Sequence, residues 1–401
     1  MDAPEFFSRG GSNLPSDRDL EKKIKILLGL YVHIPFCHRK CGYCDFNSYV
    51  MYGDIVPAFV DALHREIERC AYAGLRVATL FFGGGTPTFL EGETLAQILE
   101  HLQQRFDIAP DAEITIEANP GSVDLRKLRL LRQAGFNRLS LGVQSFDADE
   151  LRRMERIHSP QEVLQSISWA REAGFTNVNL DLIFALPDQT LERWESNLRQ
   201  AIALQPEHLS LYALMLEPGT RFHHLYQKGK LHLPDDEVQV AMFRLAQRLT
   251  REAGYQQYEI SNYALPGYEC RHNLIYWHNR PYLGFGPGAV SFYGGRRWMN
   301  VKHPREYVRR VRAGEPLDIE SEQLTGWDAV AETLMLGLRL IEGIDLAEVA
   351  QRYGLPVQAH YQPIIQSLVA RGWLLQDGSR IRLSDEGLLW HSEVAAAFLP
   401  L

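Results

Sequence analysis

Tyr31-Val-His-Ile-Pro-Phe-Cys37-His-Arg-Lys-Cys41-Gly-Tyr-Cys44 is the stretch of this sequence that decides the fold. The apolar segment 24–34, which leads into the cysteines, is leucine-rich and β-branched, as a buried parallel strand is. The three cysteines follow within eight residues, on a loop made polar by Arg39 and Lys40. In a reducing compartment such a group of thiols indicates a metal or redox site and not disulfides.

Iron is the metal that this cysteine spacing favours. Thiolates suit iron–sulfur clusters, and a short C-x3-C-x2-C loop reaches three irons of a four-iron cubane but leaves the fourth open to a small chelating molecule. A structural zinc site takes four ligands, commonly from paired C-x2-C elements, and the sequence has no second pair. His33 and His38 are nitrogen donors near the loop, so zinc stays as the alternative. We expect Cys70 to lie in a helical core.

Short apolar segments alternate with segments of helical period from this loop onward. The expected strands are 24–34, 77–82, 113–118, 138–143, 177–183 and 207–213. The expected helices are 58–70, 94–106, 125–135, 161–174 and 191–204. Several of these helices end at a glycine that leads into the next strand. This alternation predicts an α/β fold, an open, partial (β/α)6 barrel with ligands at the carboxyl ends of its strands.

The chain divides on this basis into four regions. They are a polar tail (1–24), the barrel (25–225), a connecting region (226–320) and a C-terminal module (321–401). The module combines expected helices at 328–340, 346–353 and 359–372 with a hairpin at 373–383, turning at Asp377-Gly378. Helices followed by a hairpin resemble a winged helix, which suggests DNA binding. We favour a structural or docking module, because acidic residues match or outnumber basic residues there.

Composition restricts the partners and the compartment. Apolar residues make up 45% and charged residues 23%, as in ordinary globular proteins, and the net charge is −8. An acidic balance argues against a nucleic-acid partner. The N-terminus lacks the apolar core of a signal peptide, and no stretch reaches the roughly 18 apolar residues of a membrane span. We therefore expect a cytoplasmic protein without a transmembrane segment.

The cysteine loop is similar to that of the radical SAM superfamily. Four further segments resemble its HemN/HemW branch: the residues 31–37, Gly83-Gly-Gly-Thr-Pro-Thr88, Gly142-Val-Gln-Ser-Phe146 and Asp181-Leu-Ile-Phe-Ala-Leu-Pro187. The resemblance runs from residue 30 through the C-terminal module. It implies a radical SAM barrel in which a [4Fe-4S] cluster binds to Cys37, Cys41 and Cys44. S-adenosylmethionine (SAM) would chelate the fourth iron, and an electron from the cluster would split it to a 5′-deoxyadenosyl radical.

The residues around the loop also suit a SAM pocket. A triple glycine at 83–85 lets backbone groups approach a ligand, although a tight turn would also explain it. Polar residues at successive strand ends form a ring of donors and acceptors, in which Arg156 suits a carboxylate and Asp181 suits ribose hydroxyls. The resemblance implies these SAM contacts: Tyr31, Tyr43, Gly84, Gly85, Thr86, Glu117, Gln144, Arg156 and Asp181.

Two features favour the HemW family over HemN-type coproporphyrinogen dehydrogenases. The dehydrogenases carry a further cysteine two residues after the third, where this chain has Phe46, and they have a long N-terminal extension that is missing here. HemN-type enzymes bind a second SAM molecule, and these departures leave the presence of a second SAM site in this chain open. The run His272-Asn-Leu-Ile-Tyr276-Trp277 is the second feature. The HemW family is regarded as a heme chaperone with this histidine proposed for heme.

A neutral imidazole is a good axial ligand of heme iron, and Tyr276 and Trp277 would line a porphyrin face. Alternatively, His272 satisfies a buried backbone group and both aromatics are core. Cys270 is a second soft ligand or, as we favour, an idle thiol.

The resemblance implies heme delivery to an acceptor protein and an electron donor, and it leaves open a peripheral membrane contact through the acceptor. The competing functions are oxidative decarboxylation of coproporphyrinogen III and radical chemistry on RNA. Whether the chain is an enzyme is left open. We expect no nucleic-acid partner.

Overall fold

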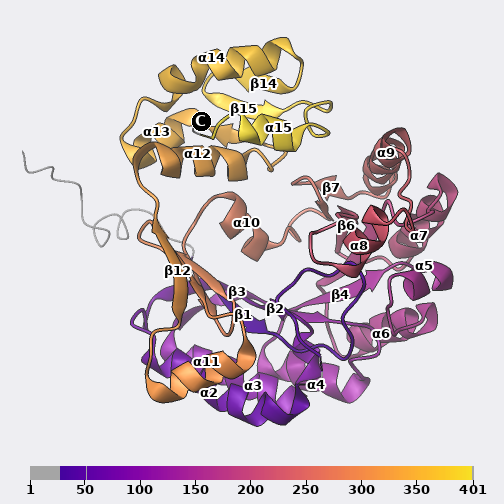
Figure 1. Ribbon diagram of the computed structural model, residues 1–401, viewed down its shortest axis with the longest axis vertical. Helices are drawn as coiled ribbons and strands as arrows, with labels where there is room; N and C mark the ends of the chain where they lie inside the picture. The colour runs from indigo at the N-terminus through magenta and orange to yellow at the C-terminus, as the bar shows by residue number, and fades with distance from the viewer. Residues whose placement is uncertain (1–27, 51, 400–401) are drawn as a thin grey trace, which may run out of the picture.

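Six parallel strands form the middle of the structure, a computed structural model that describes residues 28–50 and 52–399 (Figure 1). They are β1 (Leu28–Ile34), β2 (Arg76–Gly84), β3 (Asp107–Ala118), β4 (Arg138–Gln144), β5 (Val178–Phe184) and β6 (His208–Ala213). They lie side by side in chain order, each parallel to the next. The predicted succession of strands is confirmed, while the tail 1–24 and the first residues of segment 24–34 lie outside the described residues.

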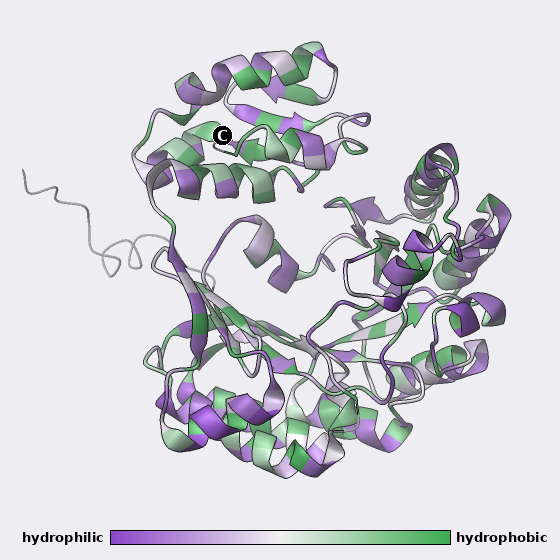
Figure 2. Cartoon of the chain, viewed as in Figure 1, coloured by the Kyte–Doolittle hydropathy of each residue, from purple (hydrophilic) through white to green (hydrophobic). Residues whose placement is uncertain are grey.

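Helices follow the strands and cover the outer face of the sheet (Figure 1). They are α2 (Val56–Arg69), α3 (Gly92–Arg105), α4 (Leu125–Ala134), α5 (Ala148–Arg153), α6 (Pro160–Glu172) and α7 (Leu191–Ala203). Their ends match the local sequence: Ser159 and Glu162 form a capping box at the start of α6, and Gly135 ends α4 with φ 115°. One hydrophobic core joins the strands to these helices except α5, whose Leu151 packs in a separate cluster. The outer helices carry both hydrophobic and hydrophilic residues (Figure 2).

The sheet is longer than the predicted six strands and does not close into a barrel. Its order is β12-β11-β10-β9-β1-β2-β3-β4-β5-β6-β8-β7. The added strands lie within residues 256–323, three residues past the predicted end of the connecting region, and they extend the sheet at both edges. They are β7 (Gln256–Gln257), β8 (Asn262–Ala264), β9 (Tyr282–Phe285), β10 (Val290–Tyr293), β11 (Arg296–Asn300) and β12 (Asp318–Gln323). The connecting region contributes the helices α9 (Asp236–Glu252), α10 (Arg271–Trp277) and α11 (Pro304–Ala313), and α8 (Arg221–Gln227) precedes it.

The C-terminal module has a core of its own. It contains α12 (Gly326–Gly337), β13 (Ile344–Asp345), α13 (Leu346–Tyr353), α14 (Val357–Ala370), β14 (Leu374–Asp377), β15 (Arg380–Leu383) and α15 (His391–Ala396). The expected hairpin is present, with Asp377 paired to Arg380 and Gly378 at φ 59°, as a primed turn requires. Its strands form a separate sheet, β13-β15-β14.

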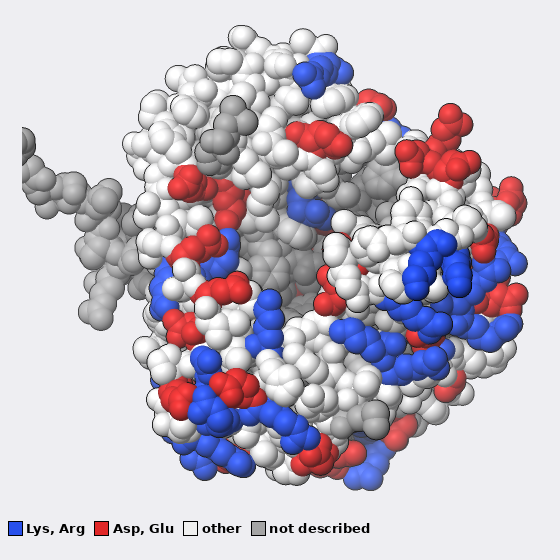
Figure 3. Space-filling model, in the orientation of Figure 1, with Lys and Arg blue, Asp and Glu red and all other residues white. Residues whose placement is uncertain are grey.

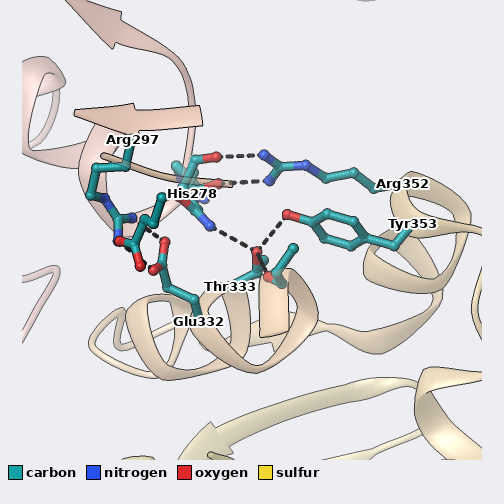
Figure 4. Close-up of polar contacts among 9 residues, drawn as sticks. His278, Arg297, Glu332, Thr333, Arg352 and Tyr353 are labelled. Atoms are coloured by element: carbon teal, nitrogen blue, oxygen red, sulfur yellow. Dashed lines mark hydrogen bonds and ion pairs between the residues drawn. The ribbon is translucent and has the colours of Figure 1, made fainter. Parts of the chain in front are cut away.

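Polar contacts attach this module to the residues that follow α10 (Figure 4). The guanidinium of Arg352 donates to the carbonyl oxygens of His278 (3.2 Å) and Asn279 (2.5 Å). The side-chain nitrogen of Asn279 donates to Thr333 Oγ1 at 3.0 Å. Arg297 of β11 forms an ion pair with Glu332 of α12. The module is thereby joined to both the sheet edge and α10.

No helix within residues 28–50 and 52–399 is both long enough and apolar enough to cross a membrane.

Candidate functional site

The three clustered cysteines lie on the loop between β1 and α2. The backbone N–H of Cys37 donates to the carbonyl of Tyr49 (3.0 Å), and that of Tyr49 donates to the carbonyl of Pro35 (2.7 Å). These bonds close the loop at its base. All three thiols are free and half-buried. The segment from Cys37 to Cys44 therefore forms a compact loop at the carboxyl end of β1.

Each thiol has a different neighbour. Cys37 Sγ lies 3.5 Å from Thr86 Oγ1, Cys44 Sγ lies 4.0 Å from Ser48 Oγ, and Cys41 Sγ accepts from Arg156 Nη1 at 3.5 Å. Burial raises the pKa of Cys37 and of Cys44. Within the described ranges, no group of three metal-ligating side chains is arranged around a single ion. Three separated thiols are compatible with a [4Fe-4S] cluster, because each thiolate of a cubane binds its own iron.

The two remaining cysteines lie away from this loop. Cys70 follows the last residue of α2, at the opposite end of the strand–helix unit. Cys270 is buried, and its thiol donates to Glu113 Oε1 at 3.6 Å, while burial raises its pKa to about 12. The loop thus contains three of the five cysteines, and the other two lie apart from it.

The triple glycine packs directly beneath the cysteine loop. Gly84 has φ 115°, and its N–H donates to Glu117 Oε2 at 3.3 Å. A Cβ on Gly85 would lie 2.8 Å from the carbonyl oxygen of Phe36 and 3.0 Å from Cys37 Sγ. The backbone N–H of Thr86 donates to the same carbonyl at 2.8 Å. Close packing against the loop therefore explains the absence of a side chain at residue 85.

Two acidic side chains lie on the central strands, Glu117 at the carboxyl end of β3 and Asp181 in the middle of β5, not at its end as predicted. Burial, together with the neighbouring Asp181, raises the pKa of Glu117 to about 8. Burial also raises the pKa of Asp181, although Asn179 Nδ2 (2.8 Å) and Ser140 Oγ (3.3 Å) donate to its carboxylate. Both carboxylates lie in a region that disfavours negative charge, so this part of the site suits a ligand that is positively charged or donates hydrogen bonds.

Arg156 connects the strand ends to the cysteine loop. Besides Cys41, its guanidinium donates to the carbonyl oxygen of Gly142 (2.6 Å) and to Asn119 Oδ1. Asn119 Nδ2 in turn donates to Thr86 Oγ1 at 2.7 Å. Gln144, with φ 67°, lies beside the same atoms: a Cβ on Gly142 would be 3.0 Å from its Nε2. Sequence reasoning missed Asn119, which its position directly after an expected strand could have indicated.

A pocket opens between the loop and this network. Its walls include His38, Cys41, Thr86, Asn119 and Arg156. The face of the molecule seen in Figure 3 is also hollowed between the C-terminal module and α8.

The two predicted tyrosines lie on different sides of the loop. The Tyr31 hydroxyl is 3.0 Å from His33 Nδ1, its ring lies 6.3 Å from that of Phe81, and burial and Glu117 raise its pKa. Tyr43 instead packs against Phe222 of α8, with ring centroids 6.2 Å apart. Tyr31 is therefore on the Glu117 side, and Tyr43 is on the Arg156 side.

His272 lies inside the fold with both ring nitrogens engaged. It is 1% exposed, with Nδ1 2.7 Å from Thr79 Oγ1 and Nε2 2.9 Å from the Tyr276 hydroxyl. Burial, with the nearby Arg138, lowers its pKa to about 3, so the ring is neutral at pH 7. Burial raises the pKa of Tyr276, which therefore keeps its proton. The neutral ring carries one proton, so one of the two hydroxyls donates to the ring and the other accepts from it.

α10 is fixed at its first turn by a buried acid that sequence reasoning missed. Glu113 of β3 accepts from the backbone N–H groups of Arg271 and His272, both at 3.1 Å. The ring of His272 also stacks on Phe81 at 5.2 Å, and Phe81 contacts Tyr31. His272 is thus linked through one aromatic side chain to the Glu117 side of the site. Trp277 points elsewhere, with the Arg339 guanidinium 4.4 Å from its ring centre.

Comparison with known proteins gives consistent results along the chain. Residues 31–201 match the Radical SAM superfamily, and residues 324–390 match the HemN C-terminal domain. The heme chaperone HemW of Bacillus subtilis is 39% identical over 92% of this chain and 98% of its own length. The heme chaperone HemW of Escherichia coli is 39% identical over 93% of this chain and 98% of its own length. The solved structure of Escherichia coli HemN, a coproporphyrinogen III oxidase, aligns with TM-score 0.82 and 28% identity, covering 93% of this chain and 90% of that one.

Proposed function

The chain belongs to the HemW family of radical SAM proteins, and from that premise we propose that it is a heme chaperone. In this proposal it binds a [4Fe-4S] cluster, SAM and heme in the cytoplasm and delivers heme to an acceptor protein. The observation that carries the proposal is the loop with Cys37, Cys41 and Cys44, whose separated thiols lie against Thr86, Ser48 and Arg156.

Each part of the site has a role in the proposal. The three thiolates hold the cluster, which when bound supplies a reducing electron and an open iron position. Thr86 and Arg156 donate toward the sulfur atoms, and such donors stabilise thiolate charge. Gly84 and Gly85 keep the backbone close beneath the loop. Because these two residues have no side chains, none blocks the place where the amino acid part of SAM would approach.

The remaining polar residues orient SAM. Arg156 pairs with its carboxylate, since a buried guanidinium next to the loop is the strongest donor there. Asp181 accepts from the ribose hydroxyls, Glu117 faces the cationic part of the molecule, and Gln144 donates from the end of β4. Tyr31 and Tyr43 bound the pocket on opposite sides.

Heme binds at His272 in this proposal. His272 Nε2 is hydrogen-bonded to the Tyr276 hydroxyl, so iron would replace that hydroxyl as the partner of Nε2. With iron on Nε2, Nδ1 would carry the ring proton and donate it to Thr79 Oγ1. The alternative ligands are Cys270, which is tied to Glu113, and the pair His223-His224 on α8.

A second function is supported by one observation, the extensive structural likeness to HemN. That function is the oxidative decarboxylation of coproporphyrinogen III. Phe46, 64% exposed, stands where the dehydrogenases carry a further cysteine, and this favours the chaperone.

One experiment separates the two functions. The protein is reconstituted with iron and sulfide without oxygen, and iron, SAM and heme are counted per chain. The same preparation is then incubated with coproporphyrinogen III, SAM and a reductant, and the products are analysed by mass. We expect one cluster and one heme per chain and no decarboxylated product, and Phe46→Cys should not create the activity. Turnover by the wild-type protein would refute the chaperone assignment.

A further inference from the structure

Asn47 attaches the end of the cysteine loop to a distant part of the chain. It lies three residues after Cys44 and is half-buried. Its side-chain nitrogen donates to the carbonyl oxygen of Pro287 at 2.9 Å and to that of Lys302 at 3.1 Å, and its side-chain oxygen accepts from the Tyr49 hydroxyl at 3.0 Å. Pro287 lies between β9 and β10, and Lys302 follows β11. One asparagine therefore joins the loop to two other segments.

The turn Gly286-Pro287-Gly288 packs tightly against the residues around the loop. A Cβ on Gly288 would collide with Asn47 Nδ2, and a Cβ on Gly286 would lie 2.5 Å from the carbonyl oxygen of His33 near the end of β1. Both glycines have positive φ, 97° at Gly286 and 76° at Gly288. His33 Nε2 is in turn hydrogen-bonded to the carbonyl oxygen of Asn47 at 2.9 Å. A shift of this turn would therefore move Asn47 with it.

A carboxylate on α2 holds the same turn. Glu66 Oε2 accepts from the backbone N–H of Gly286 at 2.8 Å and from the Tyr307 hydroxyl at 2.5 Å. Glu66 Oε1 accepts from Asn300 Nδ2 at 2.6 Å, and the same nitrogen donates to the carbonyl oxygen of Gly286 at 3.0 Å. Both backbone groups of Gly286 are thus bonded, and Glu66 joins the turn to α2, β11 and α11.

Core packing alone does not account for Glu66. Burial raises the pKa of its carboxyl group to about 7, because the charged form loses its hydration. An apolar side chain could fill this space without that cost. The carboxylate instead accepts from three donors on three separate segments. A buried polar group that is fully bonded in this way fixes one arrangement of the segments that share it.

The end of the loop is important because a cubane fixes the separation of its three ligands. The N–H of Cys37 donates to the carbonyl oxygen of Tyr49, two residues after Asn47, at 3.0 Å. Cys44 Sγ lies 4.0 Å from the hydroxyl of Ser48, the residue next to Asn47. The segment that Asn47 fixes thus contacts both the first and the last proposed ligand, and its position affects their separation.

We propose that Asn47 and Glu66 are positioning residues of the cluster. Asn47 fixes the end of the cysteine loop to the turn at residues 286–288, and Glu66 holds this turn; we call these contacts the loop clamp. The inference rests on the proposed function, because it needs a cluster on the loop. Within the described chain neither side chain is hydrogen-bonded to a cysteine. Both act on the cluster through the protein and not by contact with it.

Iron release tests the proposal on the reconstituted, cluster-loaded protein, kept without oxygen. EDTA is added, and the loss of iron–sulfur absorbance gives the rate of release. Asn47→Ala and Glu66→Ala should each release iron about tenfold faster or more, since each removes at least two hydrogen bonds and one is worth about two- to tenfold. The EPR spectrum of the dithionite-reduced cluster should also change in both. Glu66→Gln retains an acceptor for the N–H of Gly286, so its release rate should stay within about threefold of the wild type.

Two matched controls lose comparable bonds outside the loop clamp. Asn137→Ala removes a half-buried side chain that accepts from the N–H of Ile114 (2.8 Å) and donates to the carbonyl oxygen of Ala112 (2.7 Å). Glu259→Ala removes a buried carboxylate that accepts from Asn262 Nδ2 (2.6 Å). Both variants should lower the melting temperature, yet release iron at the wild-type rate and keep the wild-type EPR spectrum.

Amide hydrogen exchange of the iron-free protein gives a second readout that needs no cluster. Exchange across residues 37–50 should be faster in Asn47→Ala and Glu66→Ala than in the wild type, and unchanged there in the two controls. This measurement reports on the loop clamp itself, whether or not iron is bound.

Three outcomes would overturn the inference. Wild-type rates of iron release or of exchange in Asn47→Ala would mean that the loop clamp does not position the loop. Equally fast iron release in the two controls would mean that general destabilisation frees the iron. A wild-type protein that binds no iron would refute the proposed function and with it the role in cluster binding, and the exchange measurement would then still decide whether the loop clamp orders the loop.

Discussion

Replacing Tyr276 by Phe should tighten heme binding, whereas replacing His272 by Ala should weaken it. In the protein without heme, the Tyr276 hydroxyl is hydrogen-bonded to His272 Nε2 at 2.9 Å. If Nε2 is the iron ligand, heme must displace this hydroxyl. Tyr276→Phe removes the competitor and keeps the ring that packs against Tyr282 at 4.7 Å. The two substitutions therefore have opposite expected signs, which a purely structural role for His272 does not predict.

The magnitude follows from the bond that is lost. A net hydrogen bond contributes about 0.5–1.5 kcal/mol, so Tyr276→Phe should lower the heme dissociation constant about two- to tenfold. His272→Ala removes the iron ligand and leaves the Thr79 and Tyr276 hydroxyls without their partner. We expect His272→Ala to raise the heme dissociation constant at least about tenfold, equivalent to about 1.4 kcal/mol, and to shift the Soret band.

Heme is titrated without oxygen and followed at the Soret band, first before and then after cluster reconstitution, because the cluster absorbs in the same region. Tyr255→Phe is the matched control, since it removes another buried hydroxyl, which donates to the carbonyl of Pro206 at 2.6 Å. Its heme affinity should equal that of the wild type. Weaker binding in Tyr276→Phe, or an unchanged spectrum in His272→Ala, would refute His272 as the ligand.

Three further predictions concern the cluster and SAM. Alanine at any proposed cluster ligand should abolish the oxygen-labile iron–sulfur absorbance; these ligands are Cys37, Cys41 and Cys44. Alanine at either of the other two cysteines, Cys70 or Cys270, should leave the iron content unchanged. Arg156→Ala and Asp181→Ala should each weaken SAM binding in equilibrium dialysis. The loss of one charge-assisted contact of about 1.5–3 kcal/mol corresponds to about ten- to a hundredfold, and unchanged affinity in both would remove them from the pocket. Asp181→Ala should keep full iron content; Arg156 also touches Cys41, so its variant is checked for iron separately. SAM is a cation, and the pKa of Glu117 is raised to about 8, so SAM affinity should rise as this carboxyl ionises between pH 6.5 and 8.5. Calorimetry should show an increase of up to about tenfold per pH unit. Glu117→Gln should make SAM affinity independent of pH over this range.

The succession of strands and helices was predictable because each parallel strand is buried on both faces. Such strands appear in the sequence as short apolar runs, and β4 and β5 begin and end within one residue of their predicted bounds. β3 begins at Asp107 and not at residue 113. Its first residues, Asp-Ile-Ala-Pro-Asp, are partly exposed and include a proline, so no apolar run in the sequence indicates a strand there. The prediction that Glu117 and Asp181 lie at strand ends is right for Glu117, one residue before the end of β3, and wrong for Asp181, which lies in the middle of β5.

The outer strands were not predictable from apolar pattern. β12, Asp-Ile-Glu-Ser-Glu-Gln, is mostly exposed and nearly uniformly polar. It pairs with β11 through the backbone, and Arg296 and Arg297 form ion pairs with Asp318 and Glu322 across the two strands. Contacts that join distant segments have no local signal either. Glu113 fixes the start of α10 about 160 residues later in the chain, and only the folded arrangement brings the two together.

The position of His272 depends on two parts of the molecule at once. At its start, α10 is bonded to Glu113 of β3, in the central sheet. Just after its end, the carbonyl oxygens of residues 278 and 279 accept from Arg352 of the C-terminal module, as Figure 4 shows. A seven-residue helix bonded at both ends cannot shift independently of its supports. The module therefore helps to set the distance between His272 and Thr79 on β2. A domain that contributes no proposed ligand can thereby influence the geometry around His272, the proposed heme ligand.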